Sequence, residues 1–375
     1  MTARGARRAL RAAGALVAIA WALAGAARAE EQVRIAVASG AEAVVLSAEG
    51  LRFEPIAAGG EPREVAGGRA EVTRAGAELR VNGAPVAPPG VRFSAPGPIR
   101  DGQLALEGSV EVRIAASGLD VIHALRMEDY VAAVAGSEMP PSFPAEALKA
   151  QAVAARTFAV TKKLQALAEG RPYHLGATVV HQVYRGTAAI DPRTRAAAES
   201  TAGEVLVFED EPADAFFHAS CGGHTESGAE ALGRDRPYLR SVACGMCDGT
   251  PLARWRYRID AAALGRKLGL SRGVTELRVV ERTASGRARR IRVDAGASRV
   301  EIGGADFRQR LGWSALKSLA FEVKRERAMF TFEGRGAGHG AGMCQWGAAG
   351  LAKEGRTYRE ILARYYPGAE LRRMY

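Results

Sequence analysis

Residues 137–157 read SEMPPSFPAEALKAQAVAART, and this stretch decides how the middle of the chain folds. The adjacent Pro140 and Pro141 stop a helix, because the proline ring clashes with the preceding turn and removes a backbone donor. Ser142 and Pro144 then supply start signals for a second helix. Its apolar positions recur at helical spacing: Leu148, Ala152, Ala155 and Ala159. We therefore predict a helix over residues 125–135, a break over 136–141, and a long helix that ends at Gly170.

The chain before this stretch has the alternation of half-buried strands. Val33, Ile35 and Val37 alternate with polar or small residues, and residues 79–81 and 110–114 repeat the pattern between Gly- and Pro-containing turns. After residue 200 we expect short strands at 205–208 and 215–217, a hairpin over 276–293 and a last helix over 358–366. The fold class is α+β: a β-rich region over 30–104 precedes a mixed α/β domain over 105–371 with long glycine-rich loops.

The first residues have the order of a secretory signal peptide. Arg4, Arg7, Arg8 and Arg11 precede an apolar run over 12–24, and 27–29 read Ala-Arg-Ala, with small residues at both cleavage-site positions. The apolar run is shorter than the ~20 residues that a spanning helix needs. We therefore expect residues 1–29 to be removed, with cleavage near Ala29, and the protein to be exported to the periplasm or cell envelope. An uncleaved anchor is the alternative.

Composition and charge exclude several classes of protein. A hydrophobic content of 47% excludes a wholly disordered chain. The formal net charge of +11 becomes +6 without the five arginines of residues 1–29. Spread over the remaining chain, this excess does not indicate nucleic-acid binding. A mildly basic, solvated surface and loose attraction to an anionic cell envelope both agree with it.

Several motifs occur in an order that defines a family. They are 127–130 (MEDY) with 137–140 (SEMP); 146–157 (EALKAQAVAART); 182–186 (QVYRG); 217–225 (FHASCGGHT); 336–348 (GAGHGAGMCQWGA); and 365–368 (YYPG). Together they resemble the sporulation stage II protein D / amidase enhancer family of peptidoglycan-active proteins. The resemblance covers residues 105–371, with a weaker β-rich part reaching back to about residue 33.

The resemblance implies a lytic transglycosylase that acts on glycan strands stripped of their peptide stems, and Glu138 matches the catalytic acid. A carboxyl group beside Met139, Pro140 and Pro141 is expected in apolar surroundings, where desolvation keeps it protonated. It would protonate the glycosidic oxygen and then, as a base, deprotonate the C6 hydroxyl of N-acetylmuramic acid. That hydroxyl closes a 1,6-anhydro ring, so no second carboxylate is needed. The alternative is an exposed glutamate at a helix end.

We predict that seven further residues contact the glycan: Gln151, Arg156, Tyr184, His218, His339, Gln345 and Trp346. Trp346 would stack on a pyranose face, with core packing as the rival interpretation. Gln151 and Arg156 are polar groups in an Ala-rich helix and would otherwise face water. The glycine-rich segment lacks the G-K-[ST] ending of a phosphate loop and the G-x-G-x-x-G spacing, so nucleotide binding is not expected.

The four cysteines permit two interpretations. Cys221 precedes His224 by three residues, and Cys244 precedes Cys247 by three, which is metal-like pairing; Cys344 is the fourth cysteine. A structural zinc ion would take Cys221, Cys244 and Cys247 with either His224 or Cys344. An exported chain with an even number of cysteines equally favours two disulfides. Some relatives carry a zinc site of cysteine and histidine ligands just before the QVYRG position. Residues 173–181 contain His174 and His181 but no cysteine, so the resemblance does not carry that site over to this chain.

Two functions from different classes follow. The first is an exported peptidoglycan lytic transglycosylase that requires no cofactor and cleaves stem-free glycan strands. The second is a non-catalytic glycan-binding protein that enhances a separate cell-wall amidase. A zinc-dependent amidase is disfavoured because the chain has no H-E-x-x-H motif. In either case the partners are glycan strands and, for the second function, an amidase; neither nucleic acid nor nucleotide is expected.

Overall fold

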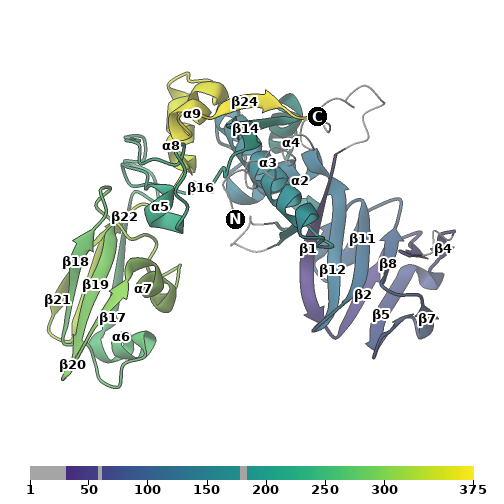
Figure 1. Ribbon diagram of the computed structural model, residues 1–375, viewed down its shortest axis with the longest axis horizontal. Helices are drawn as coiled ribbons and strands as arrows, with labels where there is room; N and C mark the ends of the chain where they lie inside the picture. Colours follow the sequence, from purple (N-terminus) through teal and green to yellow (C-terminus); the bar gives the residue numbers. More distant parts are fainter. Residues whose placement is uncertain (1–30, 58–60, 178–183) are drawn as a thin grey trace, which may run out of the picture.

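The computed structural model describes residues 31–57, 61–177 and 184–375 (Figure 1). The signal peptide expected over 1–29 and residues 182 and 183 of the QVYRG motif lie outside these ranges. The described chain has an N-terminal pair of β-sheets, a central helical layer and a second β-containing body. The α+β prediction is confirmed. No helix in the described part of the chain has the length and apolar character needed to cross a bilayer.

The N-terminal region forms two antiparallel-rich sheets that share one core. Within the described residues, one sheet has the order β13-β1-β12-β11-β8-β3-β4 and the other β10-β9-β2-β5-β6-β7. Their inward positions pack together, for example Val72 and Leu79 with Phe93 and Val112. β11 and β12 pair in the same sheet as β1, so that sheet contains strands from both sides of residue 105.

The strands of these two sheets have the following bounds: β1 Gln32–Ala41, β2 Ala43–Ser47, β3 Arg52–Pro55, β4 Arg63–Glu64, β5 Arg69–Ala75, β6 Glu78–Val81, β7 Ala84–Val86, β8 Gly90–Ser94, β9 Ile99–Asp101, β10 Leu104–Leu106, β11 Ser109–Ala115, β12 Gly118–Arg126 and β13 Leu175–Gly176.

The central helical layer is built around one long helix. It comprises α2 (Met127–Glu138), α3 (Ala145–Ala168), α4 (Pro192–Ser200), α8 (Gln345–Lys353) and α9 (Tyr358–Tyr365), with the small sheet β15-β14-β24 (Glu211–Pro212, Glu204–Phe208, Glu370–Arg373) beside it. α3 contacts all four other helices and β14, and every residue from 151 to 160 is buried. Its alanines allow this close approach from all sides.

The predicted break between the first two helices is placed too early. α2 continues through 136–138 and ends at Glu138, with Met139 as its C-cap. Proline disfavours helical geometry only in the residue directly before it, so the helix runs up to that point. The long helix and the last helix are confirmed at Ala145–Ala168 and Tyr358–Tyr365. The strand expected at 215–217 is reduced to β16 (Phe217–His218), which pairs with β23 (Met343–Cys344).

Residues 254–335 form a separate body, here called the inserted lobe. It contains β17 (Arg254–Asp260), α6 (Ala261–Leu268), β18 (Glu276–Arg282), β19 (Ala288–Ala295), β20 (Ser298–Gly303), α7 (Gly304–Leu311), β21 (Phe321–Glu326) and β22 (Met329–Arg335). The hairpin predicted over 276–293 is its β18–β19 pair. Trp255, Phe307 and Phe332 belong to its own hydrophobic core. Figure 1 shows the lobe on the opposite side of the helical layer from the N-terminal sheets.

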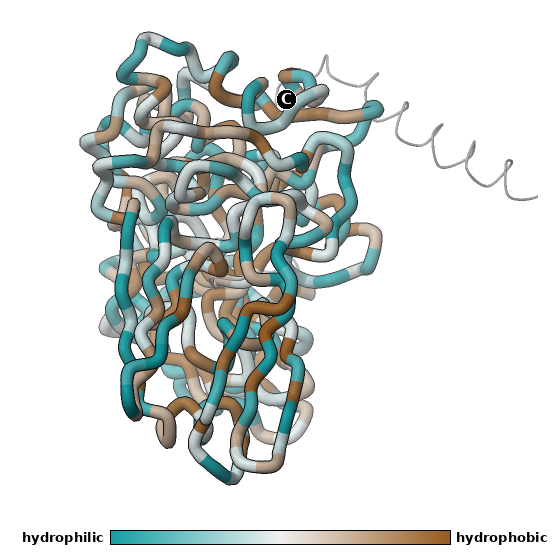
Figure 2. The backbone as a smooth tube through the Cα atoms, turned by 90° about the vertical axis from the view of Figure 1, so that its left-hand side faces the viewer, coloured by the Kyte–Doolittle hydropathy of each residue, from teal (hydrophilic) through white to brown (hydrophobic). Residues whose placement is uncertain are grey.

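The two ends of the inserted lobe meet at its base. The backbone N–H of Gly336 donates to the carbonyl oxygens of Leu252 at 3.1 Å and Ala253 at 3.3 Å. In Figure 2 the lobe faces the viewer, and hydrophilic and hydrophobic stretches alternate along its strands. The chain therefore leaves the central helical layer, builds the lobe and returns to the same place, where β23 and α8 complete the helical layer.

Candidate functional site

Glu138 is the last residue of α2, and its side chain is half-buried. The carboxyl end of α2 turns directly into the Pro140–Phe143 turn, in which the Phe143 N–H donates to the Pro140 carbonyl oxygen at 3.0 Å. Met139 is 2% exposed and packs among the residues of the helical layer. Glu138 therefore stands at the edge of the packed core, with solvent on one side, and is neither fully buried nor a freely exposed helix-end residue.

Two buried tyrosines, Tyr130 of α2 and Tyr184, lie on the core side of α2. Burial, together with the charge of Glu138, raises the pKa of Tyr130. The Tyr130 and Tyr184 rings are 5.7 Å apart, and the Tyr184 hydroxyl donates to His123 Nδ1 at 2.7 Å. Because the Glu107 carbonyl can only accept, His123 donates to it from Nε2, at 2.7 Å, which fixes the neutral tautomer. Burial lowers the pKa of His123 to about 4.

Tyr184 is therefore in a different position from the predicted one. It is 5% exposed and belongs to the core between the sheets and α2, so it supports the helix that carries Glu138 and does not face a glycan. The direction of the Tyr184 side chain depends on packing between elements far apart in the chain, which the motif does not encode.

Trp346 is the predicted glycan contact whose position agrees best with that role. It lies in the first turn of α8 and is only partly buried. Its ring packs edge-on against Phe143, with ring centroids 4.8 Å apart. Phe143 belongs to the turn that follows Glu138, so the fold brings the SEMP motif and the glycine-rich motif together across 200 residues of sequence. Trp346 thus packs on a residue of the turn that follows Glu138, with part of its side chain exposed.

Gln151 and Gln345 pair with each other inside the helical layer. Gln345 Nε2 donates to Gln151 Oε1 at 3.3 Å, and the two side chains are 5% and 0% exposed, respectively. Gln151 Nε2 has no hydrogen-bond partner among the described residues. The prediction that Gln151 faces glycan or water is wrong for this structure, because α8 covers that side of α3. The pair instead fixes α8, and with it Trp346, against α3.

Arg156 is a structural residue, and the prediction that it contacts substrate is wrong. Its side chain is fully buried and forms an ion pair with Glu128, at 3.1 Å from Nε to Oε1. Its other donors reach the carbonyl oxygens of Glu204 at 3.1 Å and Ala198 at 2.9 Å. The Tyr375 hydroxyl also donates to Glu128, at 2.8 Å. A guanidinium with this many internal acceptors joins α2, α3, α4 and β14 and has no surface to offer a ligand.

His218 and His339 fasten the glycine-rich loop to β16. His339 Nε2 donates to the Phe217 carbonyl at 2.9 Å, and its Nδ1 accepts the Ala341 N–H at 3.1 Å. His218 Nδ1 donates to the Ala341 carbonyl at 3.0 Å. Burial lowers the pKa of His339 to about 4 and that of His218 well below 6.5, so both rings are neutral. Both nitrogens of His339 and Nδ1 of His218 bond to the backbone, while His218 Nε2 is buried without a hydrogen-bond partner among the described residues. These bonds do not support the predicted contact with glycan.

The glycines of this loop serve the same packing. A Cβ on Gly342, at φ +67°, would lie 1.9 Å from the Phe216 carbonyl oxygen, and one on Gly338 would lie 2.7 Å from His218 Cβ. The glycines therefore allow the loop to lie directly on the segment around β16. Close backbone approach is required here by the packing of the protein itself.

The cysteine cluster comes together without His224. The sulfur atoms of Cys221, Cys244, Cys247 and Cys344 lie within 4.8 Å of one another, and all four side chains are buried. His224 is exposed, and its backbone carbonyl accepts from Arg287 at 3.0 Å. Of the two candidates for the fourth position, Cys344 is therefore the one that the fold supplies. The prediction that His224 could be a metal ligand is therefore corrected: the described cluster consists of the four cysteines.

Three residues near the site were not predicted to belong to it. Phe143 stands under Trp346, Tyr130 lies beside Glu138 on α2, and Arg287 of the inserted lobe reaches the turn after Cys221. Tyr130 is part of the MEDY motif, and its sequence position two helical turns before Glu138 would have indicated it. Nothing local marks Phe143 or Arg287, because their roles depend on contacts with distant segments.

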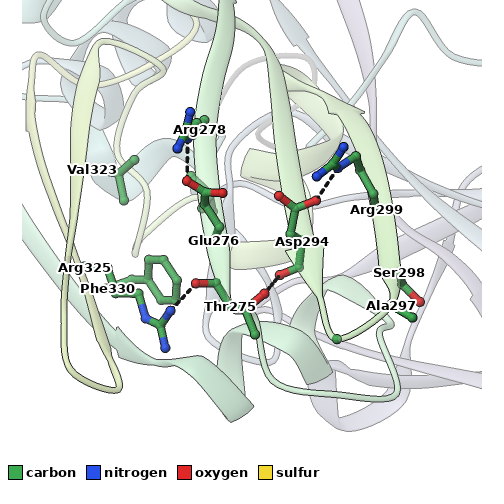
Figure 3. A pocket seen from close by; sticks show the side chains of 12 residues that line it. Thr275, Glu276, Arg278, Asp294, Ala297, Ser298, Arg299, Val323, Arg325 and Phe330 are labelled. Carbon is green, nitrogen blue, oxygen red and sulfur yellow. Dashed lines mark hydrogen bonds and ion pairs between the residues drawn. The ribbon is translucent and has the colours of Figure 1, made fainter.

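The inserted lobe also contains a surface hollow of about 870 Å³ (Figure 3). It is lined by charged side chains that pair with one another, including Glu276 with Arg278 and Asp294 with Arg299 at 2.7 Å. None of the predicted site residues lines it. Since its charges are already paired and exposed, the hollow offers no reactive group, and the candidate site remains at the end of α2.

The comparison with protein families divides the chain as the structure does. The family described as stage II sporulation protein matches residues 115–208, which run from the end of β11 through α2, α3 and α4 to β14. A domain of unknown function (DUF8618) matches residues 246–342, which contain the inserted lobe.

Comparison with individual proteins covers more of the chain than the family match does. Stage II sporulation protein D of Bacillus subtilis is 32% identical over 289 residues, covering 73% of this chain and 82% of that protein. An uncharacterized protein of Brachyspira hyodysenteriae is 36% identical, covering 67% of this chain and 68% of that protein. The amidase enhancer of Bacillus subtilis is 27% identical, and the match spans 39% of its length. The chain belongs to the stage II sporulation protein D family, as its motifs predicted.

Proposed function

We propose that this protein is an exported peptidoglycan lytic transglycosylase that cleaves glycan strands lacking peptide stems, with Glu138 as acid and then base. The family membership and the likeness to an amidase enhancer support a function at the cell wall. The observation that carries the enzymatic proposal is the position of Glu138: a half-exposed carboxyl group at the end of α2, followed directly by the turn whose Phe143 packs on Trp346.

The position of Glu138 favours proton donation. The carboxyl end of a helix carries partial negative charge, which disfavours a nearby carboxylate and so favours the protonated acid. The next residue, Met139, is buried, while the Glu138 side chain is only half-buried and leaves room for a glycan to approach. Proton donation from a carboxyl group is how glycosidic oxygens are made into leaving groups.

The reaction needs one carboxyl group of the protein. As the bond from C1 of N-acetylmuramic acid to the glycosidic oxygen breaks, Glu138 gives its proton to that oxygen. The resulting carboxylate takes the proton of the C6 hydroxyl of the same sugar, whose oxygen bonds to C1. The products are a 1,6-anhydro end and a new free hydroxyl end, and Glu138 is again protonated. No water and no metal ion takes part in this sequence.

Trp346, supported by the buried Phe143, is proposed to hold the glycan in place. A pyranose ring offers apolar C–H faces, and a partly exposed tryptophan offers a flat apolar surface of matching size. The buried Gln151–Gln345 pair fixes the first turn of α8 and thus the Trp346 ring. Positioning of this kind converts binding into the alignment that the reaction needs.

The test is Glu138→Gln, which keeps the shape of the side chain and removes the transferable proton. General acid–base catalysis contributes ~10²–10⁴-fold, so turnover of stem-free strands is expected to fall at least ~100-fold, with binding retained. Mass spectrometry of 1,6-anhydro ends measures it. Glu146→Gln is the matched control. Glu146 is half-buried at the start of α3, and its Oε2 accepts the Tyr358 N–H at 2.8 Å, a bond that the amide oxygen of a glutamine can keep.

The same experiment distinguishes the proposed enzyme from the second candidate function, a non-catalytic enhancer of an amidase. Near wild-type release of anhydro ends by Glu138→Gln ends the proposed role of Glu138. If wild type and variant both bind glycan and neither cleaves it, the protein is a glycan-binding enhancer of a separate amidase. The likeness to the amidase enhancer favours keeping that candidate.

A further inference from the structure

We propose that Cys221, Cys244, Cys247 and Cys344 bind one structural zinc ion through four thiolates, and that this ion fastens the inserted lobe to the central helical layer. The proposal is independent of the proposed chemistry of Glu138. It concerns how the chain holds its two bodies together, and each of its tests reads metal content or stability in place of glycan cleavage.

The arrangement of the sulfur atoms is that of a four-ligand site. Cys247 Sγ lies 3.3 Å from that of Cys221, 3.6 Å from that of Cys244 and 3.2 Å from that of Cys344. A disulfide joins only two sulfur atoms, at ~2.05 Å, so two disulfides do not account for a sulfur atom that has three near neighbours. Four thiolates around zinc at ~2.3 Å stand ~3.8 Å apart in a tetrahedron, which is close to the spacing observed.

The surroundings of the cluster are those that thiolates require. Cys344 Sγ accepts the backbone N–H groups of Cys221 and Gly347, both at 3.2 Å, and it caps the N-terminus of α8. The Tyr365 hydroxyl lies 3.1 Å from Cys244 Sγ. Donors directed at ligand sulfur atoms orient them and stabilise their negative charge. These donors come from three separate segments of the chain.

Gly347 shows how closely the elements approach the sulfur atoms. A Cβ at this position would lie 2.1 Å from the Tyr365 hydroxyl oxygen and 2.5 Å from Cys244 Sγ. Glycine therefore allows α8 to rest directly on the cluster, where any other residue would push the helix away. Glycine within a helix destabilises that helix, and the need to keep this space free for a metal site explains why it is present here.

A positive charge from the inserted lobe stands beside the cluster. Arg287, at the hairpin between β18 and β19, is 3% exposed. Its Nη2 donates to the carbonyl oxygens of Cys221 at 2.8 Å and His224 at 3.0 Å. Arg287 Nη1 donates to Ser285 Oγ at 2.7 Å, and Ser285 in turn donates to the carboxylate of Glu226, itself 2% exposed, at 2.7 Å. Zinc with four thiolates carries a net charge of about −2, so a nearby buried cation stabilises it.

The ligands lie at both ends of the inserted lobe. Cys244 and Cys247 precede β17, Cys344 follows β22, and Cys221 lies in the turn after β16. One ion would therefore join the entry and the exit of the lobe to the central helical layer. It would also hold the start of α8, where Gln345 and Trp346 are located. The described cluster thus has a structural purpose that is visible in the fold.

The first experiment measures the metal content and oxidation state of the exported full-length protein. We expect about one zinc per chain by elemental analysis, and four thiols that react only after denaturation with a chelator. Replacement by Co²⁺ should produce the intense visible and sulfur-to-metal charge-transfer bands of a tetrahedral thiolate site. A metal-free protein whose intact mass is lower by four hydrogens contains two disulfides and overturns the proposal.

The second experiment uses variants. Cys247→Ser and Cys344→Ser are expected to lose the bound metal and to unfold at lower temperature, whereas His224→Ala, which changes the exposed neighbour, keeps about one zinc. Zinc content that falls in His224→Ala and persists in Cys344→Ser would contradict the ligand set. If the cysteine variants do not fold, the Co²⁺ spectrum of the wild type decides the question without them.

Discussion

The central helical layer and the inserted lobe solve the problem of stability in opposite ways. The helical layer buries polar groups: Arg156 with Glu128 and Gln151 with Gln345. The lobe buries two arginines, Arg287 and Arg308, but places ion pairs such as Glu276–Arg278, whose side chains are 45% and 69% exposed, at its surface. It fills its core with aromatic residues such as Phe307, Phe321 and Phe332. Buried polar pairs specify one arrangement of helices, whereas exposed pairs leave stability to the apolar core.

The first prediction compares ion pairs in the two bodies. Glu128→Gln leaves the buried guanidinium of Arg156 without its counter-charge and is expected to destabilise the protein by about 3–5 kcal/mol. The same change at exposed Glu276 in the lobe should cost within about 1 kcal/mol. Urea unfolding of both variants measures the difference. Equal effects would show that the two bodies do not differ in how they use charge.

The second prediction concerns pH. All six histidines lie outside the lobe. The pKa of His123 is lowered to about 4 by burial, so the unfolded chain binds its proton at higher pH than the folded one. The stability that this neutral histidine provides is present above pH 6.5 and is lost as the pH falls from there toward 4, with an upper limit on the order of 3 kcal/mol.

Hydrogen exchange at pH 7 and pH 5 tests this prediction by region. The region around β12 and α2 should lose protection at the lower pH, while the lobe keeps its own. His123→Gln retains a donor and an acceptor but does not titrate, so it should flatten the dependence; His224→Gln, at an exposed side chain, is the control. Unchanged protection around β12 at pH 5 would contradict the assignment of a neutral buried His123.

The third prediction places the glycan on one of the two bodies. Trp346 is partly buried on Phe143 in the helical layer, and Trp313 of the lobe is 52% exposed, with the Arg308 guanidinium 4.6 Å from its ring centre. In the non-cleaving Glu138→Gln background, Trp346→Leu is expected to weaken binding of stem-free glycan about tenfold, or ~1.4 kcal/mol. Trp313→Leu should leave binding unchanged. Isothermal titration measures both, and the opposite order would move the binding surface to the lobe.

The sequence by itself determined the family, the α+β class and the positions of the long helix α3 and the last helix α9, whereas it ended α2 three residues too early. These depend on local signals: the double proline after Glu138, the spacing of alanines in α3 and the alternation of the early strands. It also brought the four cysteines to attention. Such features are readable because the period of a helix or strand and the effect of proline act over a few residues.

The tertiary structure decided which of the singled-out residues face outward. Arg156, Gln151 and Tyr184 were expected at a glycan surface and are buried, because α3 is covered on every side and Tyr184 packs behind α2. It also chose Cys344 over His224, paired Phe143 with Trp346, and placed a whole lobe between β16 and α8. Each of these depends on contacts between segments far apart in the chain, and no local pattern encodes the direction from which a distant element will cover a side chain.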